Sequence, residues 1–306
     1  MRPGRRRFLK NAVLAAGLAP FAGGGRAAPR PGPAFGVVAD PQYADIPDRG
    51  RRSYRASVGK LTEAVADFNR RDLDFCVNLG DAIDRDWGSF DAILAPLANA
   101  RAPWRHVLGN HDFGVDPSRL AQVPARLGIA SRRSTFDVAG VRFVILDSGA
   151  VSTYAHPPGS SARAAAAAEL ARLKAAKSPQ AFDWNGGFGE EQLRWFDRLA
   201  AEAQDADRPV VVLAHHPLLP SRAHVAWDAP AALEIVLRRR SVVAWFCGHD
   251  HAGAYAERDG VHFITFQGMV ETPDQNAYAF VSIHGRRMLI EGRGREPTRD
   301  LRLRAG

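Results

Sequence analysis

Five short apolar runs, each of β-forming residues, end abruptly in a cluster of polar residues. Runs of this length and composition, bounded by polar and glycine-rich segments, predict buried β-strands. The runs therefore predict strands that carry polar side chains at their carboxyl ends. They occupy residues 35–39, 73–77, 104–108, 210–214 and 242–247.

Helix-like segments lie between these strands. Val58, Leu61, Val65 and Phe68 recur at helical spacing within 55–70. Alternation of strand and helix predicts an α/β protein with a largely parallel sheet interior. The other predicted helices span 90–97, 190–203 and 231–240, and further strands are predicted at 141–146, 261–266 and 279–283.

Ligands of such sheets bind outside the carboxyl ends of the strands, so the polar clusters are expected to meet. Imidazole, carboxylate and amide donors together suit divalent Mn, Fe or Zn. Seven donors are too many for one tetrahedral zinc ion, and they predict two ions that share a carboxylate. We expect Asp81 to be the shared group because it follows a glycine in the middle of the set. The seven are Asp40, Gln42, Asp81, Asn110, His215, His249 and His251.

The order of these residues resembles that of the calcineurin-like metallophosphoesterases. Five blocks match and span most of the chain after residue 34. The resemblance implies an αββα two-sheet sandwich with a dinuclear site on one edge. The blocks are Asp40-x-Gln42, Gly80-Asp81-x-x-Asp84, Gly109-Asn110-His111-Asp112, His215 and Gly248-His249-x-His251.

The first block departs from the usual Asp-x-His pattern, because Gln42 stands where the family has histidine. Together with residues 40–45, 189–196 and 266–272, this departure resembles the manganese-dependent ADP-ribose/CDP-alcohol diphosphatase subgroup. An amide oxygen in place of imidazole favours a harder ion, hence Mn²⁺ over Zn²⁺, with Fe also compatible.

The resemblance also implies a role for each residue. Asp40, Gln42, Asp81 and His251 would hold the first ion, and Asp81, Asn110, His215 and His249 the second. A metal-bound hydroxide would attack phosphorus. His111 would stabilise the transition state or protonate the leaving group, and Asp112 would orient His111.

The favoured function is hydrolysis of the diphosphate in a nucleoside diphosphate compound of the ADP-ribose or CDP-alcohol type. One alternative is an exported phosphomonoesterase or phosphodiesterase that scavenges phosphate. A second is an exported metal- or nucleotide-binding protein without catalysis. Walker-type, Gly-x-Ser-x-Gly and His-Glu-x-x-His motifs are absent from the sequence, so other hydrolase classes lack support.

The amino terminus predicts export. Residues 5–10, Arg-Arg-Arg-Phe-Leu-Lys, resemble a twin-arginine signal, and the apolar run that follows is too short to span a membrane. We expect residues 1–34 to be a signal peptide and short linker recognised by the twin-arginine machinery, residues 35–306 to be the metallophosphoesterase domain, and the location to be periplasmic or secreted.

The formal net charge of +8 does not indicate nucleic-acid binding. Residues 1–28 hold six basic residues and no acid, so the remainder is close to neutral and needs no phosphate-backbone surface. Cys76 and Cys247 lie in apolar runs and are expected to be buried thiols, although export would permit a bridge. The sequence leaves the roles of His216, His224 and Asp147 open.

Overall fold

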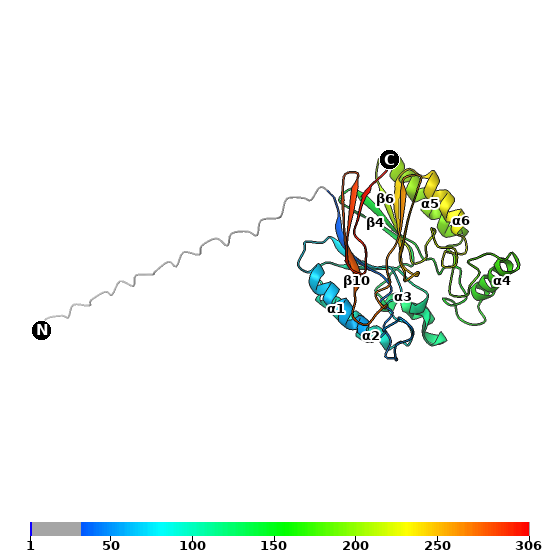
Figure 1. Ribbon diagram of the computed structural model, residues 1–306, viewed down its shortest axis with the longest axis horizontal. Coiled ribbons are helices and arrows are strands. Elements are labelled where there is room, and N and C mark those ends of the chain that lie inside the picture. The colour runs from blue at the N-terminus through cyan, green and yellow to red at the C-terminus, as the bar shows by residue number, and fades with distance from the viewer. Residues whose placement is uncertain (2–31, 306) are drawn as a thin grey trace. The chain divides into compact units, whose positions relative to one another are not determined.

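Two six-stranded mixed sheets form the centre of the fold (Figure 1). The computed structural model describes Met1 and residues 32–305. The first sheet has the order β12-β11-β10-β1-β2-β3, and the second has the order β4-β5-β6-β7-β9-β8. The strands are β1 (Ala34–Val38), β2 (Phe75–Asn78), β3 (Trp104–His106), β4 (Ser134–Val138), β5 (Val141–Ile145), β6 (Val210–Leu213), β7 (Val242–Cys247), β8 (Ala254–Arg258), β9 (Val261–Thr265), β10 (Ala277–His284), β11 (Arg287–Gly294) and β12 (Arg299–Arg302).

Helices cover the outer face of each sheet. The α-helices are α1 (Ala56–Phe68), α2 (Ser89–Leu94), α3 (Val123–Arg126), α4 (Ser161–Ala175), α5 (Glu190–Asp205) and α6 (Ala229–Arg238). Three 3₁₀ turns, η1 (Ala95–Asn99), η2 (His111–Phe113) and η3 (Pro117–Gln122), complete the elements of the described residues.

Alternate side chains of the strands build three apolar layers. Phe35 of β1 packs between the sheets, where Phe143 and Phe246 reach it from the second sheet. Val38, on the opposite face of β1, packs with Leu61 of α1. Helices α5 and α6 bury their apolar faces on the far side of the second sheet. The fold is therefore an αββα sandwich, as the family resemblance implies.

The predicted parallel interior is confirmed for the central strands. β1 pairs in parallel with β2, β2 with β3, and β5, β6, β7 and β9 pair in parallel in sequence. Antiparallel strands flank both groups. The sequence prediction missed β4, β8, β11 and β12, because their side chains alternate between exposed and covered positions and form no continuous apolar run.

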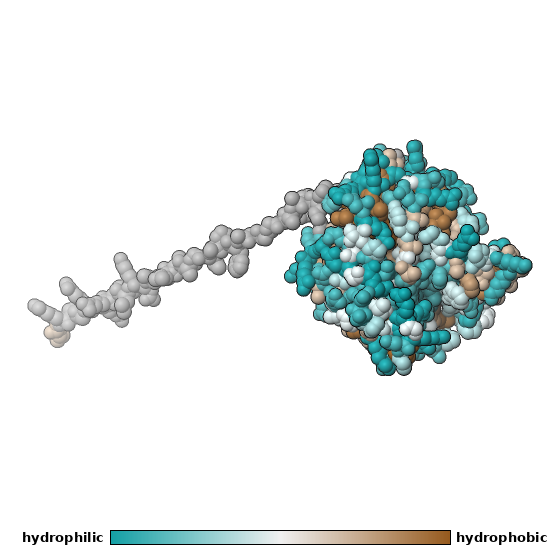
Figure 2. Space-filling view, viewed as in Figure 1, coloured by the Kyte–Doolittle hydropathy of each residue, from teal (hydrophilic) through white to brown (hydrophobic). Residues whose placement is uncertain are grey.

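The alanine-rich segment forms α4, which Ser160 caps by accepting a hydrogen bond from the Arg163 amide at 3.2 Å. In the view of Figure 2 the described surface is mostly hydrophilic, with small scattered hydrophobic patches. Within the described residues, no helix is both long and apolar enough to cross a bilayer. The predicted twin-arginine segment lies almost entirely outside the described residues.

Candidate dinuclear metal centre

The parallel strands deliver the seven predicted donors to one edge of the sandwich. Asp40 follows β1, Asp81 follows β2, Asn110 follows β3, and His215 and His249 follow β6 and β7. Every one of the seven side chains is at most 9% exposed. Their convergence confirms that the polar clusters meet, and their role as ligands stays a prediction.

The first group lies around Gln42. Its Nε2 is 2.9 Å from His251 Nε2 and 3.0 Å from Asp81 Oδ2. Asp40 Oδ1 lies 3.6 Å from His251 Nε2. These four side chains are the set that the resemblance implies for the first ion.

The second group lies around His215. Its Nε2 is 3.3 Å from Asp81 Oδ2, 3.1 Å from Asn110 Oδ1 and 3.2 Å from His249 Nδ1. One ligand atom each from Asp81, His215 and His249 lies within 4.8 Å of the others. Because Asp81 Oδ2 contacts a member of both groups, Asp81 occupies the position that a bridging carboxylate requires.

Each of the three histidines is held at the ring nitrogen that faces away from the cluster. His215 Nδ1 donates to the Leu79 carbonyl at 2.8 Å, and His251 Nδ1 donates to Glu271 Oε1 at 2.9 Å. His249 Nε2 donates to Asn185 Oδ1 at 2.8 Å. These acceptors fix the tautomers and leave the other nitrogen as a lone-pair donor, which is how proteins orient histidine ligands.

The backbone at the cluster is unusual. Asp40, Gln42, Asp81 and His249 all have positive φ, between 43° and 68°, a region that non-glycine residues rarely occupy. Glycines sit where other backbone must approach: a Cβ at Gly80 would collide with His215, one at Gly109 with Asp81, and one at Gly248 with Asp40. The glycines of the sequence motifs therefore make room for the donor side chains.

The side-chain amide of Gln42 gives a second indication that the cluster suits divalent metal ions. Gln42 Oε1 is buried without a hydrogen-bond partner, while its Nε2 points at Asp81 and His251. Rotating the amide by 180° keeps its shape and aims the oxygen into the cluster as a ligand. Carboxylate, amide and imidazole donors held this closely suit Mn²⁺, Fe²⁺ or Zn²⁺.

Without cations, the carboxylates hold protons on two imidazoles. Burial lowers the pKa of His215, but Asp81 outweighs it and raises the pKa to about 9. Burial likewise opposes Asp40 and Glu271 at His251, whose pKa also rises to about 9. Burial and the neighbouring histidines lower the pKa of His249. A metal ion would take the place of the protons, so metal binding is expected to release them.

The predicted pairing of His111 with Asp112 is wrong. Asp112 is fully buried and accepts hydrogen bonds from the backbone amides of Asp81, Ala82 and Gly109, at 3.2, 2.8 and 2.9 Å. Burial, with the nearby Asp81 charge, raises its pKa to about 7. Asp112 holds the turn that carries Asp81 and does not contact the His111 ring.

Asp84 is the partner of His111. His111 Nδ1 lies 3.2 Å from both Asp84 Oδ1 and the Asp84 carbonyl oxygen. Burial opposes the charge of His111, but Asp81 and Asp84 together raise its pKa above the ordinary value. Asp84 belongs to one of the matching sequence blocks, but the sequence prediction gave His111 a different partner, Asp112.

A cavity of about 400 Å³ opens over the cluster. His111, Asn110 and His249 line it, together with two residues that the sequence prediction did not name, Arg52 and Trp184. His224, whose role was open, lines it too and lies 3.6 Å from Asp250. Long loops carry Arg52, Trp184 and His224. Loops have no periodic pattern of apolar residues, so the position of these side chains around the cavity could not be predicted from the sequence.

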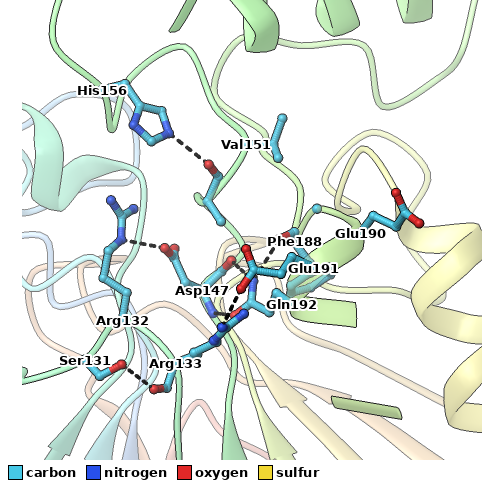
Figure 3. Close-up of a pocket in the computed structure, with 12 residues that line it drawn as sticks. Ser131, Arg132, Arg133, Asp147, Val151, His156, Phe188, Glu190, Glu191 and Gln192 are labelled. Carbon is cyan, nitrogen blue, oxygen red and sulfur yellow. Dashed lines mark hydrogen bonds and ion pairs between the residues drawn. The ribbon is translucent and has the colours of Figure 1, made fainter. Parts of the chain in front are cut away.

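A larger cavity of about 570 Å³ lies at the end of β5 (Figure 3). Its charges are paired: Arg132 Nε lies 2.6 Å from Asp147 Oδ2, and Arg133 binds Glu191 at 2.7 Å. Asp147 also accepts from the Gly149 amide, so its contacts are those of a structural anchor. None of the seven candidate donors lines this cavity.

His216 and the cysteines take structural positions. His216 Nδ1 lies 2.7 Å from Ser148 Oγ, and its Nε2 lies 3.4 Å from the Trp184 carbonyl. Cys76 and Cys247 are free, buried thiols in different sheets, as expected. Burial raises the pKa of Cys76 to about 12 and that of Cys247 further.

Known proteins with similar sequences and folds point to one family. The sequence profile of the calcineurin-like phosphoesterases matches residues 34–253. A manganese-dependent ADP-ribose/CDP-alcohol diphosphatase from Mus musculus is 30% identical over 87% of this chain and 92% of its own length. The protein of the same name from Danio rerio is 30% identical over 85% of this chain and 95% of its own.

Solved structures with similar folds point to the same family. A dimetal phosphatase from Danio rerio has a TM-score of 0.80 and 28% identity, covering 90% of this chain and all of its own. Purple acid phosphatase from yellow lupin has a TM-score of 0.55 at 13% identity over 88% of this chain and 52% of its own, a likeness of fold alone. With the sandwich and the converged donors, these similarities establish that the chain belongs to the calcineurin-like phosphoesterase family of metal-dependent phosphoester hydrolases.

Proposed function

We propose that this protein hydrolyses the diphosphate bond of nucleoside diphosphate compounds of the ADP-ribose or CDP-alcohol type, with Mn²⁺ as its preferred ion. The observation that carries the proposal is Gln42, which occupies a cluster position between Asp81 and His251 where the family usually has histidine. The diphosphatase names of the relatives, which match over most of their length, support the same substrate class.

Two divalent ions bound by the seven donors would supply a nucleophile at neutral pH and neutralise phosphate charge. The oxygen of water adds to one phosphorus, and the bond from that phosphorus to the bridging oxygen breaks. The bridging oxygen leaves on the second phosphate and needs a proton. His111 faces the cavity, and because Asp84 holds its Nδ1, Nε2 is the nitrogen that can donate to this oxygen.

Arg52 is placed to bind a substrate phosphate. It lines the cavity, and its backbone bridges to Glu271, so the chain on which it stands is tied to the turn that holds His251. Its Nη1 lies 4.0 Å from Asp84 Oδ1, which leaves the guanidinium free for a stronger anionic partner.

Product analysis tests the proposal. Mn²⁺-loaded protein is given ADP-ribose, CDP-choline and a simple phosphomonoester separately. We expect AMP from the first and CMP from the second, without inorganic phosphate. Asp81→Asn should abolish turnover, whereas Asp300→Asn, which changes an exposed carboxylate on β12, should not. Turnover of the monoester alone would refute the diphosphatase assignment and favour phosphate scavenging.

We also propose that residues 1–34 direct export through the twin-arginine machinery to the periplasm or medium. The support is the motif at residues 5–10. Fusion of residues 1–34 to a folded reporter, in bacteria with and without that machinery, tests it. Export that continues after both Arg5 and Arg6 are changed to lysine would contradict the proposal.

A further inference from the structure

Two aromatic side chains are exposed side by side on one loop. The rings of Phe182 and Trp184 stack with centroids 4.2 Å apart and planes 14° from parallel, yet 37% and 41% of the two residues remain exposed. Among the described residues other than Met1, only Tyr255 is a large hydrophobic residue exposed to this degree. A stacked pair left open to water marks a surface that a ligand can cover.

The pair adjoins the metal centre. Trp184 lines the cavity of about 400 Å³ together with His111, His249 and Arg52. A molecule whose phosphates reach His249 and Arg52 therefore has Trp184 within the same cavity. Phe182 stacks on one face of the Trp184 ring and supports it.

The loop is held in place by the site itself. Asn185 Oδ1 accepts from His249 Nε2, while its Nδ2 donates to the Gln180 and Ala223 carbonyls at 2.9 and 2.6 Å. The Phe182 carbonyl accepts from Trp227 Nε1 at 3.1 Å. These bonds fix the backbone on both sides of Trp184, so the stacked rings are preorganised relative to the cluster.

We propose that the Phe182–Trp184 pair is a stacking platform for the aromatic base of a nucleotide whose phosphates lie at the metal centre. The proposal rests on the proposed function and assigns its base-binding residues. Stacking uses the face of a base, which purines and pyrimidines share, so the platform accepts both adenine and cytosine. One flat platform thereby explains how a single site takes ADP-ribose and CDP-alcohols.

Binding of matched ligands tests the platform. Titration calorimetry of the Mn²⁺-loaded full chain compares AMP and CMP with ribose 5-phosphate, which carries a phosphate and no base. We expect both nucleotides to bind more tightly, and Trp184→Ala to weaken them by about 5- to 150-fold while ribose 5-phosphate is unchanged. Trp184→Phe should keep most of the preference.

Controls separate stacking from a structural effect. Tyr255→Ala removes an equally exposed aromatic ring, 40% exposed, that does not line this cavity, and should leave all three affinities unchanged. If Trp184→Ala does not fold, Trp184→Leu removes the flat ring and keeps an apolar side chain. Nucleotide affinities in either variant equal to those of the parent protein would overturn the platform.

Failure of the platform and failure of the proposed function give different results. A parent protein that releases AMP from ADP-ribose, with KM unchanged in Trp184→Ala, refutes the platform alone. A raised KM with a similar kcat supports it. A parent protein that binds AMP through Trp184 but cleaves no diphosphate supports the platform and refutes the proposed function.

Discussion

Asn185→Leu is expected to weaken metal binding, although Asn185 is not one of the seven donors. Its Oδ1 accepts from His249 Nε2 at 2.8 Å, and its Nδ2 donates to two loop carbonyls. The residue is fully buried. Leucine has a similar size and shape but can make none of these three hydrogen bonds, so the change isolates their contribution.

The expected loss of stability follows from the number of buried polar groups that Asn185→Leu leaves without a hydrogen-bond partner. One imidazole N–H and two carbonyl oxygens lose their partners, which at about 1 kcal/mol or more for each group amounts to about 3 kcal/mol. For a domain of this size that loss lowers Tm by about 5 °C. His249 also loses the acceptor that fixes its tautomer, so the Kd for Mn²⁺ should rise about 10- to 100-fold.

Asn276→Leu is the matched control. Asn276 is buried and also makes three hydrogen bonds, to the Lys60 carbonyl, to Glu63 and from the Ala277 amide, at 3.1 Å or less. It contacts none of the donors. Thermal unfolding of both metal-free variants measures the cost in stability, and competition with a chromophoric chelator measures Mn²⁺ affinity.

The two variants should lose comparable stability and differ in metal affinity. If Asn185→Leu unfolds at a lower temperature yet binds Mn²⁺ as the parent protein does, the hydrogen bond to His249 does not orient a ligand. Equal weakening of Mn²⁺ binding in both variants would instead mean that lower stability alone reduces affinity. Either result would refute the reasoning.

Two further substitutions test the site, and one measurement of thiol reactivity tests the core. Glu271→Gln removes the charge that holds His251 Nδ1 and should raise the Kd for Mn²⁺ about 10- to 100-fold, measured by the same competition. His111→Asn should lower kcat about 10²- to 10⁴-fold with Mn²⁺ content unchanged, because the Nδ1 of its ring is paired with Asp84 and not with one of the seven donors; a loss of bound metal would contradict this. Burial raises the thiol pKa of both Cys76 and Cys247, so neither should react with a disulfide reagent at pH 8 until denaturant is added, when two thiols should appear. Rapid reaction of the native protein would show that the thiols are accessible.

The sequence could bring the candidate donors together because all of them except Asn110 follow a strand that has no exposed residue. Every residue of β7 (Val242–Cys247) is buried, so its apolar run is continuous and the polar residues after it stand out. Parallel pairing then brings such ends together. The combination of strand type and polar terminus is enough to place His215, His249 and Asp81 near one another without knowledge of any contact.

The partners of the donors could not be predicted in the same way. Asn185 is 64 residues from His249 along the chain, and the loop that carries it has no periodicity. For Asp112 the error was the reverse, because the sequence prediction gave it a partner, His111, that it does not have. It is adjacent to His111 in sequence, but neighbours on the 3₁₀ turn point in different directions, so His111 faces the cavity and Asp112 the backbone amides beneath it.

Asp112 also explains how the strained turn at Asp81 persists. A residue with positive φ costs of order 1 kcal/mol or more unless its surroundings require it. Here the amides of Asp81 and Ala82, and that of Gly109 from the neighbouring strand end, all converge on one buried carboxylate.

The strained backbone at Asp81 and the hydrogen bonds that restrain it together fix the direction of the Asp81 carboxylate. Positive φ at Asp81 turns its carboxylate toward both groups of donors, and the three amide bonds to Asp112 hold the turn in that form. Gly109 must lack a side chain because Asp81 occupies the space that its Cβ would take. The motif Gly109-Asn110-His111-Asp112 therefore places four different features in four consecutive residues. Gly109 leaves room for the Asp81 carboxylate, Asn110 is a predicted metal donor, His111 faces the cavity, and Asp112 holds the turn after β2.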